Sequence, residues 1–392
     1  MPLGAVEDVT DKTGGSMQKR QIAKLNITTS RLGFGAMRLP EQDGKINEPK
    51  AVEMLDYLHQ NGVTYYDTAW FYHNSQSEPF VGRNLVERYP RDSFTVATKL
   101  PIDFCDKPED MSRIFETQRK NLGLSCIDFY LMHGLDTASW EKAKRFGAPD
   151  FLKRLKDEGK IRFAGFSFHD KNEAFIPILD DFPWEFCQIQ LNYADWYQRR
   201  ADHLYDALAE RGIPIILMEP VRGGGLSNLP SEMAAQLAER DPSASQASWA
   251  LRFCDALPHV DVVLSGMSTL EQCRENVDIF SAARPLDQAD QEALRSVAAA
   301  FDRLPTIPCT QCRYCASCPQ NIDIEKLFRW YNNFQRFQDT WPLSFVYWNE
   351  VAEDKRASAC IRCGQCEAAC PQRIAVMDEL QKVHQTAELL RK

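Results

Sequence analysis

The sequence predicts an α/β protein in which a (β/α)₈ barrel, the TIM-barrel fold, is followed by a small, mainly helical, cysteine-rich domain. Three observations predict it. Eight short apolar runs alternate with helical patterns, polar residues end several of these runs, and eight of the 13 cysteines are concentrated between Cys309 and Cys370. With 392 residues the chain has room for one barrel of about 250 residues and a smaller second domain.

The apolar runs predict the strands of the barrel. Alternation of such runs with helices is typical of parallel βα units. Eight units close naturally into a barrel, whereas an open doubly wound sheet more often carries a glycine-rich phosphate loop after its first strand, and no GxGxxG motif follows here. We therefore expect barrel strands at Leu32–Met37, Val63–Asp67, Phe94–Lys99, Ile127–His133, Ile161–Ser167, Glu185–Leu191, Ile213–Glu219 and Val260–Gly266.

Helical patterns fill the intervals between the runs, and a weaker run, Gln18–Asn26, predicts a hairpin that closes the barrel floor. Residues 1–16, rich in Gly, Asp and Thr, read as a flexible extension outside the fold. A helical pattern and the stiff linker Pro305–Pro308 precede the cysteines, so we expect a barrel over 17–300 and a second domain over 301–392. The expected helices are Glu48–Gln60, Pro108–Asn121, Trp140–Glu158, Ala201–Glu210, Leu270–Phe280 and Leu286–Leu304.

Composition and charge exclude several classes of protein. The chain is 44% apolar and 26% charged, as in soluble globular proteins, and has no run of about 18 apolar residues to span a membrane. Its formal net charge of -9 argues against a nucleic-acid partner. A large chain without a signal peptide does not need disulfides, so the cysteines indicate a reducing compartment, and we expect a cytoplasmic protein.

Polar residues at the ends of the apolar runs are the candidate catalytic group. Asp67 and Tyr72 follow one run, Lys99 ends the next, and His133 ends the one after. The steps from Asp67 to Lys99, to His133 and to Ser167 are 32, 34 and 34 residues, as expected for one strand and one helix per step. Active sites of such barrels lie at the C-terminal ends of the strands. Each residue alone could be a polar strand end, but the set with Tyr72 indicates a site.

Two cysteine motifs predict the metal chemistry of the second domain. The first is CxxCxxCxxCP from Cys309, and the second, CxxCxxCxxxCP from Cys360, matches the ferredoxin pattern for [4Fe–4S] clusters. Zinc is the alternative, but two dense quartets supply more cysteines than zinc ribbons use. The ferredoxin crossing pattern predicts two clusters, one held by Cys309, Cys312, Cys315 and Cys370 and the other by Cys318, Cys360, Cys363 and Cys366.

The 41 residues between the two motifs carry a helical pattern at Ile324–Gln338, and another follows at Met377–Leu390. These patterns predict a helical ferredoxin-like domain. We expect its aromatic residues to pack in the core; they are Trp330, Tyr331, Trp341, Tyr347 and Trp348.

The order of several motifs over Met17–Ala283 resembles the aldo-keto reductase family. They are Leu32–Arg38 (LGFGAMR), Asp67 with Tyr72, Lys99, Leu131–His133 (LMH), Gly165–Ser167 (GFS) and Glu275 with Asn276. The resemblance implies a (β/α)₈ barrel, a nicotinamide cofactor and a catalytic Asp, Tyr, Lys and His. The whole chain resembles a branch of that family with a C-terminal [4Fe–4S] ferredoxin-type domain.

The chemistry of the four residues agrees with that resemblance. Carbonyl reduction needs a hydride, which the cofactor supplies, and a proton for the developing alkoxide. Tyr72 is the expected proton donor. Lys99 would lower the pKa of Tyr72, Asp67 would hold Lys99 charged and oriented, and His133 would hydrogen-bond the substrate oxygen.

The resemblance also implies the cofactor contacts. Ser167 and Gln188 would hold the nicotinamide carboxamide, and Met218 stands where relatives often have a stacking aromatic residue. Arg222 would contact a phosphate, unless the segment Glu219–Gly225 is a plain glycine-rich surface loop. Gly266 and Gln272 stand where many relatives have basic residues for the 2′-phosphate of NADP, which weakens the prediction of NADP, but Ser268 and Arg274 could supply partial replacements. We expect NADP or NAD, with NADP slightly favoured. The adenosine end would meet Ser265, Ser268, Gln272, Glu275 and Asn276.

Aromatic and histidine side chains near the strand ends allow two interpretations each. Trp70, Phe71, Trp196 and Tyr197 either line the substrate pocket or only pack, and His73 and His169 are either polar groups at the pocket rim or direct participants.

Three functions remain open from the sequence. In the first, which we favour, the barrel reduces an aldehyde or ketone, or oxidises an alcohol, with NAD(P)H, and the clusters serve structure or exchange electrons with a redox partner protein. In the second, the protein is an electron carrier or redox sensor whose barrel binds nucleotide as a regulatory ligand. In the third, a zinc-stabilised interaction module is fused to a reductase.

Overall fold

The computed structural model describes residues 16–168, 172–198, 201–282, 284–309, 315–370 and 373–391. Contacts within the chain form two compact units. The first contains the described residues up to Arg222 together with Ala247–Gln291, and the second contains Gly223–Gln246 together with the described residues from Glu292 onward. The border between these two units does not coincide with the expected domain boundary at residue 300. That boundary stays a prediction.

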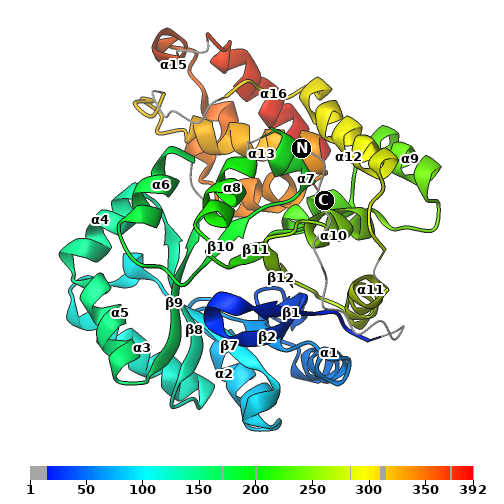
Figure 1. Ribbon diagram of the computed structural model, residues 1–392. Helices are drawn as coiled ribbons and strands as arrows, with labels where there is room; N and C mark the ends of the chain where they lie inside the picture. The colour runs from blue at the N-terminus through cyan, green and yellow to red at the C-terminus, as the bar shows by residue number, and fades with distance from the viewer. Residues whose placement is uncertain are drawn as a thin grey trace. The chain divides into compact units, whose positions relative to one another are not determined.

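The first unit is built on a closed barrel of eight parallel strands in the order β10-β11-β12-β3-β6-β7-β8-β9 (Figure 1). Every expected strand is present, with each end within two residues of its predicted position. The apolar runs form strands because both faces of a barrel strand are buried, by the barrel interior and by the surrounding helices. The strands are β3 (Leu32–Gly35), β6 (Tyr65–Asp67), β7 (Thr95–Leu100), β8 (Ile127–Leu135), β9 (Ile161–Phe168), β10 (Phe186–Gln190), β11 (Ile215–Met218) and β12 (Val260–Ser265).

A hairpin closes the barrel floor, as the sequence predicted. Its strands are β1 (Lys19–Ile22) and β2 (Ile27–Ser30), which pair antiparallel around a short 3₁₀ turn at Ala23–Leu25. Ile22 and Leu25 are buried in the same cluster as side chains from the barrel interior, including Phe129. The opposite end of the barrel therefore carries the strand termini that bear polar side chains.

A second hairpin was not predicted. It consists of β4 (Glu41–Gln42) and β5 (Lys45–Ile46), and it lies in the segment between β3 and α1 (Glu48–Gln60). Its strands are only two residues long, and short exposed runs carry almost no periodic signal.

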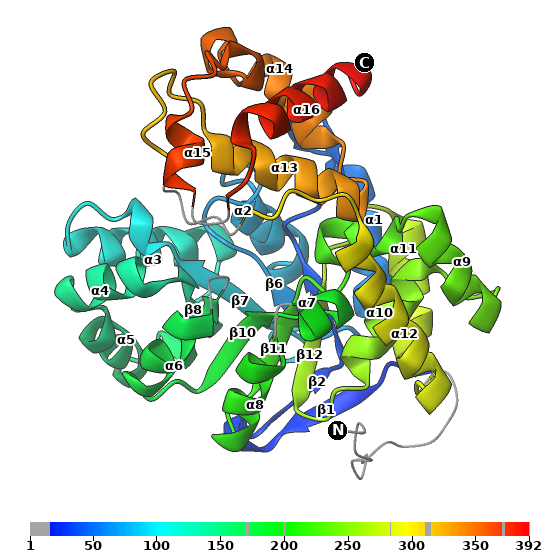
Figure 2. The same ribbon diagram turned by 90° about the horizontal axis from the view of Figure 1, so that it is seen from above.

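The helices of the first unit follow the expected patterns with one correction. The pattern Trp140–Glu158 predicted a single helix, whereas the structure has α4 and α5 separated at Gly147, whose φ of 76° is left-handed and cannot continue a helix. The other helices lie around the strands (Figure 2). The helices are α1, α2 (Ser77–Val81), α3 (Glu109–Leu122), α4 (Thr137–Arg145), α5 (Ala148–Asp157), α6 (Asn172–Asp180), α7 (Tyr193–Gln198), α8 (Asp202–Glu210), α10 (Gln246–Asp255) and α11 (Leu270–Ser281).

The second unit is helical and has its own hydrophobic core. In α13 (Ile324–Phe337) the buried residues Ile324, Leu327, Phe328 and Tyr331 recur at helical spacing and face this core. No strand occurs in the described residues of this unit, in agreement with the helical domain expected. Its further helices are α9 (Ser231–Arg240), α12 (Gln288–Ala300), which begins in the first unit, α14 (Tyr347–Asn349), α15 (Gln365–Ala369) and α16 (Val376–Leu389).

The aromatic residues of this unit mostly confirm the expected core packing. Trp330, Tyr331 and Tyr347 are buried, and Trp348 packs against the core. The expectation was wrong for Trp341, which is 57% exposed and stacks on the exposed Phe345 with ring centroids 4.3 Å apart. Among the described residues, no helix is long and apolar enough to cross a membrane.

Candidate active site

The barrel brings the four predicted catalytic residues together. Asp67 ends β6, Lys99 lies near the end of β7 and His133 lies near the end of β8, on neighbouring parallel strands. Tyr72 lies in the turn that follows β6. Because parallel strands end at the same rim of a barrel, side chains 32 to 34 residues apart in the sequence become neighbours.

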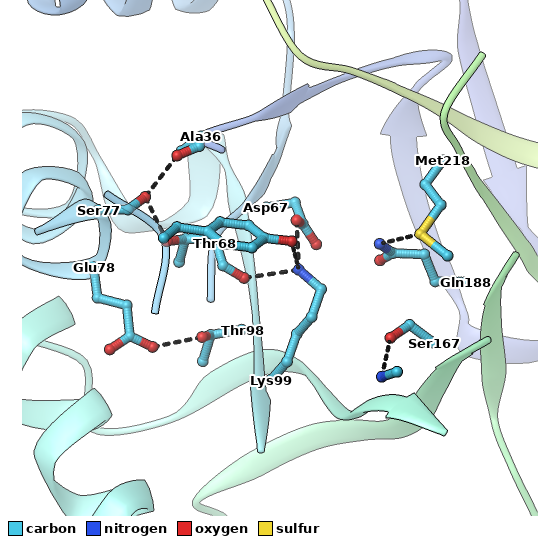
Figure 3. A network of polar contacts seen from close by, with 12 residues as sticks. Ala36, Asp67, Thr68, Ser77, Glu78, Thr98, Lys99, Ser167, Gln188 and Met218 are labelled. Carbon is cyan, nitrogen blue, oxygen red and sulfur yellow. Dashed lines mark hydrogen bonds and ion pairs between the residues drawn. The ribbon is translucent and has the colours of Figure 1, made fainter. Parts of the chain in front are cut away.

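Lys99 lies at the centre of this group (Figure 3). Its ammonium Nζ donates hydrogen bonds to Asp67 Oδ1 at 2.6 Å, to the carbonyl oxygen of Thr68 at 2.8 Å and to the Tyr72 hydroxyl at 3.4 Å. Lys99 is 1% exposed and Asp67 is 2% exposed. A buried ion pair of this kind needs hydrogen-bond partners for its charges, and the three acceptors supply them for the ammonium.

Burial and charge act in opposite directions on the two proton-carrying groups. Burial lowers the pKa of Lys99, but the nearby Asp67 and Tyr72 more than compensate and raise it above the usual lysine value, so the ammonium stays charged. For Tyr72, burial raises the pKa and Lys99 lowers it, with a net rise above 10.0. The expected effect of Lys99 on Tyr72 is therefore present, but burial outweighs it.

His133 lies against aromatic rings at the mouth of the barrel. Its ring is parallel to that of Phe71, with centroids 4.8 Å apart, and is edge-on to Tyr72 at 6.1 Å. Phe71 also stacks on Phe104, with ring centroids 5.6 Å apart. Phe71 is 40% exposed and Phe104 is 55% exposed, so the two rings form an apolar wall beside the catalytic group. The sequence indicated Phe71 but not Phe104, which lies in a short 3₁₀ turn after β7.

Trp196 and Tyr197 pack against neighbouring aromatic rings. Trp196 packs edge-on against Tyr205 and Phe253 at 5.3 and 5.9 Å, and Tyr197 contacts Phe253 at 6.2 Å. His169 lies outside the described residues.

The sequence did not predict a layer of polar residues that lies behind Asp67, Tyr72 and Lys99. Ser77 Oγ lies 2.8 Å from Thr68 Oγ1 and donates to the carbonyl oxygen of Ala36 at 2.8 Å. The buried Glu78 accepts a hydrogen bond from Thr98 Oγ1 at 2.6 Å (Figure 3) and another from Gln118 Nε2 at 2.7 Å.

Gln118 extends this layer to the catalytic lysine, because its Nε2 also donates to the carbonyl oxygen of Lys99 at 2.9 Å. Burial raises the pKa of Glu78. Ser77 and Glu78 open the short helix α2, and only the tertiary contacts give them a role.

The residues expected at the nicotinamide lie on adjacent strands beside Lys99. Ser167 Oγ accepts a hydrogen bond from the Gly134 amide at 2.8 Å, and Gln188 Nε2 lies 3.4 Å from Met218 Sδ. The Gln188 side-chain oxygen is buried and has no donor among the described residues. A carboxamide group offers the N–H that this oxygen needs, so the residues fit a nicotinamide.

The residues expected at the adenosine end lie on one segment. Asn276 Nδ2 donates to Ser265 Oγ at 2.8 Å, and the Ser268 amide donates to Gln272 Oε1 at 2.7 Å, at the beginning of α11. Glu275 lies on the same helix and is partly exposed. Arg222 is held elsewhere, because its Nη1 donates to the buried Asp195 Oδ1 at 2.7 Å.

Four cysteines of the second unit line one pocket. Cys318, Cys360, Cys363 and Cys366 line it together with apolar side chains such as Ile324 and Leu380. These four are one of the two ligand sets expected from the sequence. Within the described ranges, no three Cys, His, Asp or Glu side chains are arranged as the ligands of a single metal ion.

The second expected set is only partly described. Cys309, Cys315 and Cys370 pack against the core of the second unit, whereas Cys312 lies outside the described residues. Soft thiolate donors in an apolar pocket fit an iron–sulfur cluster, and the chemistry of the donor set agrees with the motif.

A buried ammonium–carboxylate pair beside a tyrosine lies at the C-terminal rim of this parallel barrel, which is where the active sites of barrel enzymes lie. A model of the Aldo/keto reductase family matches residues 31–299. The chain belongs to this family. A model of the 4Fe-4S dicluster domain matches residues 308–375, so a ferredoxin-type domain follows the barrel.

Several characterised proteins are similar to the chain. L-galactose dehydrogenase of Arabidopsis thaliana is 26% identical over 307 residues, which cover 73% of this chain and 95% of the relative. NADH-specific methylglyoxal reductase of Escherichia coli is 24% identical over 342 residues, which cover 73% of this chain and 100% of the relative.

Solved structures support the barrel fold. The holo form of an aldo-keto reductase from Bacillus halodurans superposes with a TM-score of 0.61 at 24% identity, covering 72% of this chain and 96% of that one. An aldo/keto reductase from Klebsiella pneumoniae, solved with NADP and acetate, gives a TM-score of 0.57 at 19% identity and covers 70% of this chain and 93% of that one.

Proposed function

We propose that the barrel is an NAD(P)H-dependent carbonyl reductase, which converts an aldehyde or ketone to an alcohol or catalyses the reverse reaction, with Tyr72 as the general acid and base. The observation that carries this proposal is the hydrogen-bonded group of Asp67, Lys99 and Tyr72 at the barrel rim. A phenol that is buried beside a permanent cation can release a proton to a developing alkoxide, because the cation stabilises the phenolate that remains.

The protein residues have separate tasks in this reaction. Tyr72 donates its hydroxyl proton to the carbonyl oxygen of the substrate. Lys99 stabilises the phenolate, and Asp67 together with the Thr68 carbonyl holds the ammonium in place. His133 would hydrogen-bond the same substrate oxygen, and the stacked rings of Phe71 and Phe104 would limit the access of water to that position. NAD(P)H, when bound, supplies the hydride.

The cofactor would be held by residues on three parts of the barrel. Ser167 and Gln188 would bind the carboxamide, with Met218 against the ring. Ser265, Ser268, Gln272, Glu275 and Asn276 would hold the adenosine end. Arg222 would contact the phosphates only after it leaves Asp195, so nucleotide binding would exchange one ion pair for another. NADP is slightly favoured over NAD.

The second domain would hold two [4Fe–4S] clusters. The four cysteines around the pocket, Cys318, Cys360, Cys363 and Cys366, would bind one cluster, and Cys309, Cys312, Cys315 and Cys370 would bind the other. A hydride carries two electrons and a cluster exchanges one, so the clusters would either stabilise the domain or serve a separate redox partner protein.

The names of two relatives suggest the first substrates to test. One is named for L-galactose and the other for methylglyoxal. The starting panel therefore contains small aldehydes and sugars, each as the carbonyl compound and as the corresponding alcohol. The cluster-loaded protein is mixed anaerobically with NADPH or NADH and each carbonyl compound, or with NADP or NAD and each alcohol.

The proposal predicts that the nucleotide is oxidised only when a carbonyl compound is present, with one alcohol formed per nucleotide. If nucleotide is consumed without a carbonyl while the clusters become reduced, the electron-carrier function replaces the reductase. Measured iron and sulfide, with no zinc, support the clusters, whereas zinc in stoichiometric amount would indicate an interaction module instead.

A further inference from the structure

The turn after Tyr72 has an unusual backbone. His73, Asn74 and Ser75 have φ values of 51°, 52° and 64°, so three consecutive residues other than glycine adopt the left-handed conformation. Single residues of this kind are uncommon, and surrounding contacts must hold a run of three. The turn is closed by the amides of Gln76 and Ser77, which donate to the carbonyl oxygens of His73 and Tyr72 at 3.0 and 3.2 Å.

The His73 side chain supplies one of these contacts. It is only 5% exposed, although it lies at the rim of the barrel. The Leu39 amide donates a hydrogen bond to His73 Nε2 at 3.1 Å, and His73 Nδ1 lies 2.6 Å from Glu41 Oε1. Because an amide can only donate, Nε2 must be the unprotonated acceptor, and the hydrogen-bond network then assigns the proton to Nδ1, which donates to the Glu41 carboxylate.

We name this pair of hydrogen bonds the His73 bridge. It joins the turn after Tyr72 to Leu39, which lies between β3 and the β4–β5 hairpin, and to Glu41, the first residue of β4. Ser77 makes a second connection to the same segment, through its hydrogen bond to the Ala36 carbonyl oxygen. Both connections therefore fix the turn that directly follows Tyr72 to the segment of residues 36–41.

We propose that His73 is a positioning residue for Tyr72. It does not touch the reacting atoms; its ring holds the left-handed turn so that the Tyr72 hydroxyl stays within reach of Lys99 Nζ, 3.4 Å away. Without the bridge, residues 73–75 can relax toward the more populated right-handed or extended conformations, and such a change is transmitted directly to the neighbouring Tyr72. The inference rests on the proposed function, because it assigns His73 a task in the reaction of Tyr72.

The bridge also connects catalysis with the hairpin. Glu41 is 52% exposed and belongs to β4, so movement of the hairpin alters the partner of His73 Nδ1.

The test compares His73→Ala and His73→Asn with the wild-type, cluster-loaded protein. Asparagine tolerates the left-handed conformation but is too short to reach both Leu39 and Glu41. The matched control is His59→Asn, which removes a partly buried histidine that also makes one hydrogen bond, to Ser93 Oγ at 2.9 Å, on helix α1. Methylglyoxal with NADPH and NADH, or any better carbonyl from the substrate panel, is the probe.

We expect kcat to fall about 10- to 100-fold in His73→Ala, since small misplacements of a catalytic group have effects of this size. In His73→Asn, kcat should fall less. The KM of the nucleotide should stay unchanged in both variants. The solvent deuterium isotope effect on kcat should rise, because proton transfer from Tyr72 becomes slower. His59→Asn should lose stability without any of these changes. Unchanged kcat and isotope effect in a folded His73→Ala would overturn the inference.

Amide hydrogen exchange gives a readout that does not need turnover. In His73→Asn, residues 36–41 and 70–76 should exchange faster than in the wild type, whereas exchange in α1 should not change. If the wild type reduces no carbonyl compound, the proposed function fails, and this exchange measurement alone decides whether the bridge holds the turn. Unchanged exchange in both segments would contradict it.

Discussion

Tyr72 illustrates how one residue obtains its chemistry from its surroundings. Burial raises its pKa and Lys99 lowers it, and the net rise above 10.0 leaves the hydroxyl protonated at neutral pH. A protonated phenol is the form that reduction needs, and the adjacent ammonium is ready to stabilise the phenolate once the proton leaves.

Removal of the Tyr72 hydroxyl should abolish carbonyl reduction. In Tyr72→Phe the ring and its packing remain, but the proton donor is lost, so we expect kcat to fall by about 10² to 10⁴. The nucleotide contacts are unaffected, so the dissociation constant of NADPH, measured by fluorescence titration, should change less than about twofold. Turnover close to the wild-type value would remove Tyr72 from its assigned role.

The raised pKa of Tyr72 predicts opposite pH dependences for the two directions. The protonated phenol is the active form in reduction, so kcat/KM should be flat through neutral pH and fall only as the pH rises through the raised pKa, above 10. The phenolate is the active form in alcohol oxidation, so that rate should rise over the same range.

Lys99→Met extends this test. Loss of the cation raises the pKa of Tyr72 further, so alcohol oxidation at a fixed alkaline pH should fall more than reduction does. Steady-state rates over the pH range in both directions measure this, and a reduction rate that already declines near pH 7 would argue that another group donates the proton.

Among the secondary-structure elements, the short helix α2 connects several strand ends near the site. Its first two residues, Ser77 and Glu78, connect the ends of β3, β6 and β7, and Glu78 reaches Lys99 through Gln118. These contacts join elements that are distant in the sequence, so they fix the spacing between Asp67 and Lys99.

Glu78→Ala should therefore destabilise the barrel. The substitution removes the acceptor of the buried Thr98 hydroxyl and of one N–H of the Gln118 amide, whose other N–H keeps the Lys99 carbonyl oxygen, and this costs about 1–3 kcal/mol of the free energy of unfolding for each group that loses its partner. Chemical denaturation measures the loss, and Glu78→Gln, which keeps an acceptor oxygen, should lose less. The exposed Glu116→Ala is the control and should change stability by less than about 1 kcal/mol.

The sequence predicted the long elements well and the short ones poorly. The eight apolar strands and an amphipathic helix such as α1 have clear sequence patterns. The ends of each lie within two residues of their predicted positions. A break such as Gly147 depends on one backbone conformation, and the β4–β5 hairpin consists of two strands of only two residues each. Helical periodicity continues across such a glycine, which is why α4 and α5 were predicted as one helix.

The same distinction holds for the site. Asp67, Tyr72, Lys99 and His133 could be selected because reactive side chains ended successive strands. Ser77, Glu78 and Gln118 could not, because their importance lies in buried hydrogen bonds between elements. Arg222 was expected to face a phosphate, and its ion pair with Asp195 has no signature in the sequence.

At the scale of the whole molecule, each of the two units has its own core, and the second unit gathers four cysteines at one pocket. Cys363 is the exposed member of this set. Replacement of one thiolate ligand removes a cluster or makes it labile.

Cys363→Ser should therefore lower the content from about eight irons to about four per chain and reduce the visible absorbance of the anaerobic protein. Iron and sulfide analysis measures this. Cys126→Ser, which changes a partly buried cysteine in the barrel, is the control and should keep the full content. Unchanged iron in Cys363→Ser would contradict the ligand assignment.

The central claim is that the barrel transfers a hydride from the nucleotide to a carbonyl carbon, with Tyr72 supplying the proton. The most direct test uses NADPH deuterated at the transferred position, the cluster-loaded protein and methylglyoxal or the best carbonyl found, with mass spectrometry of the alcohol. The account predicts one deuterium on the new carbinol carbon with the wild type and almost no labelled product with Tyr72→Phe. Oxidation of the nucleotide without deuterium in the product, or equal labelling by both proteins, would contradict it.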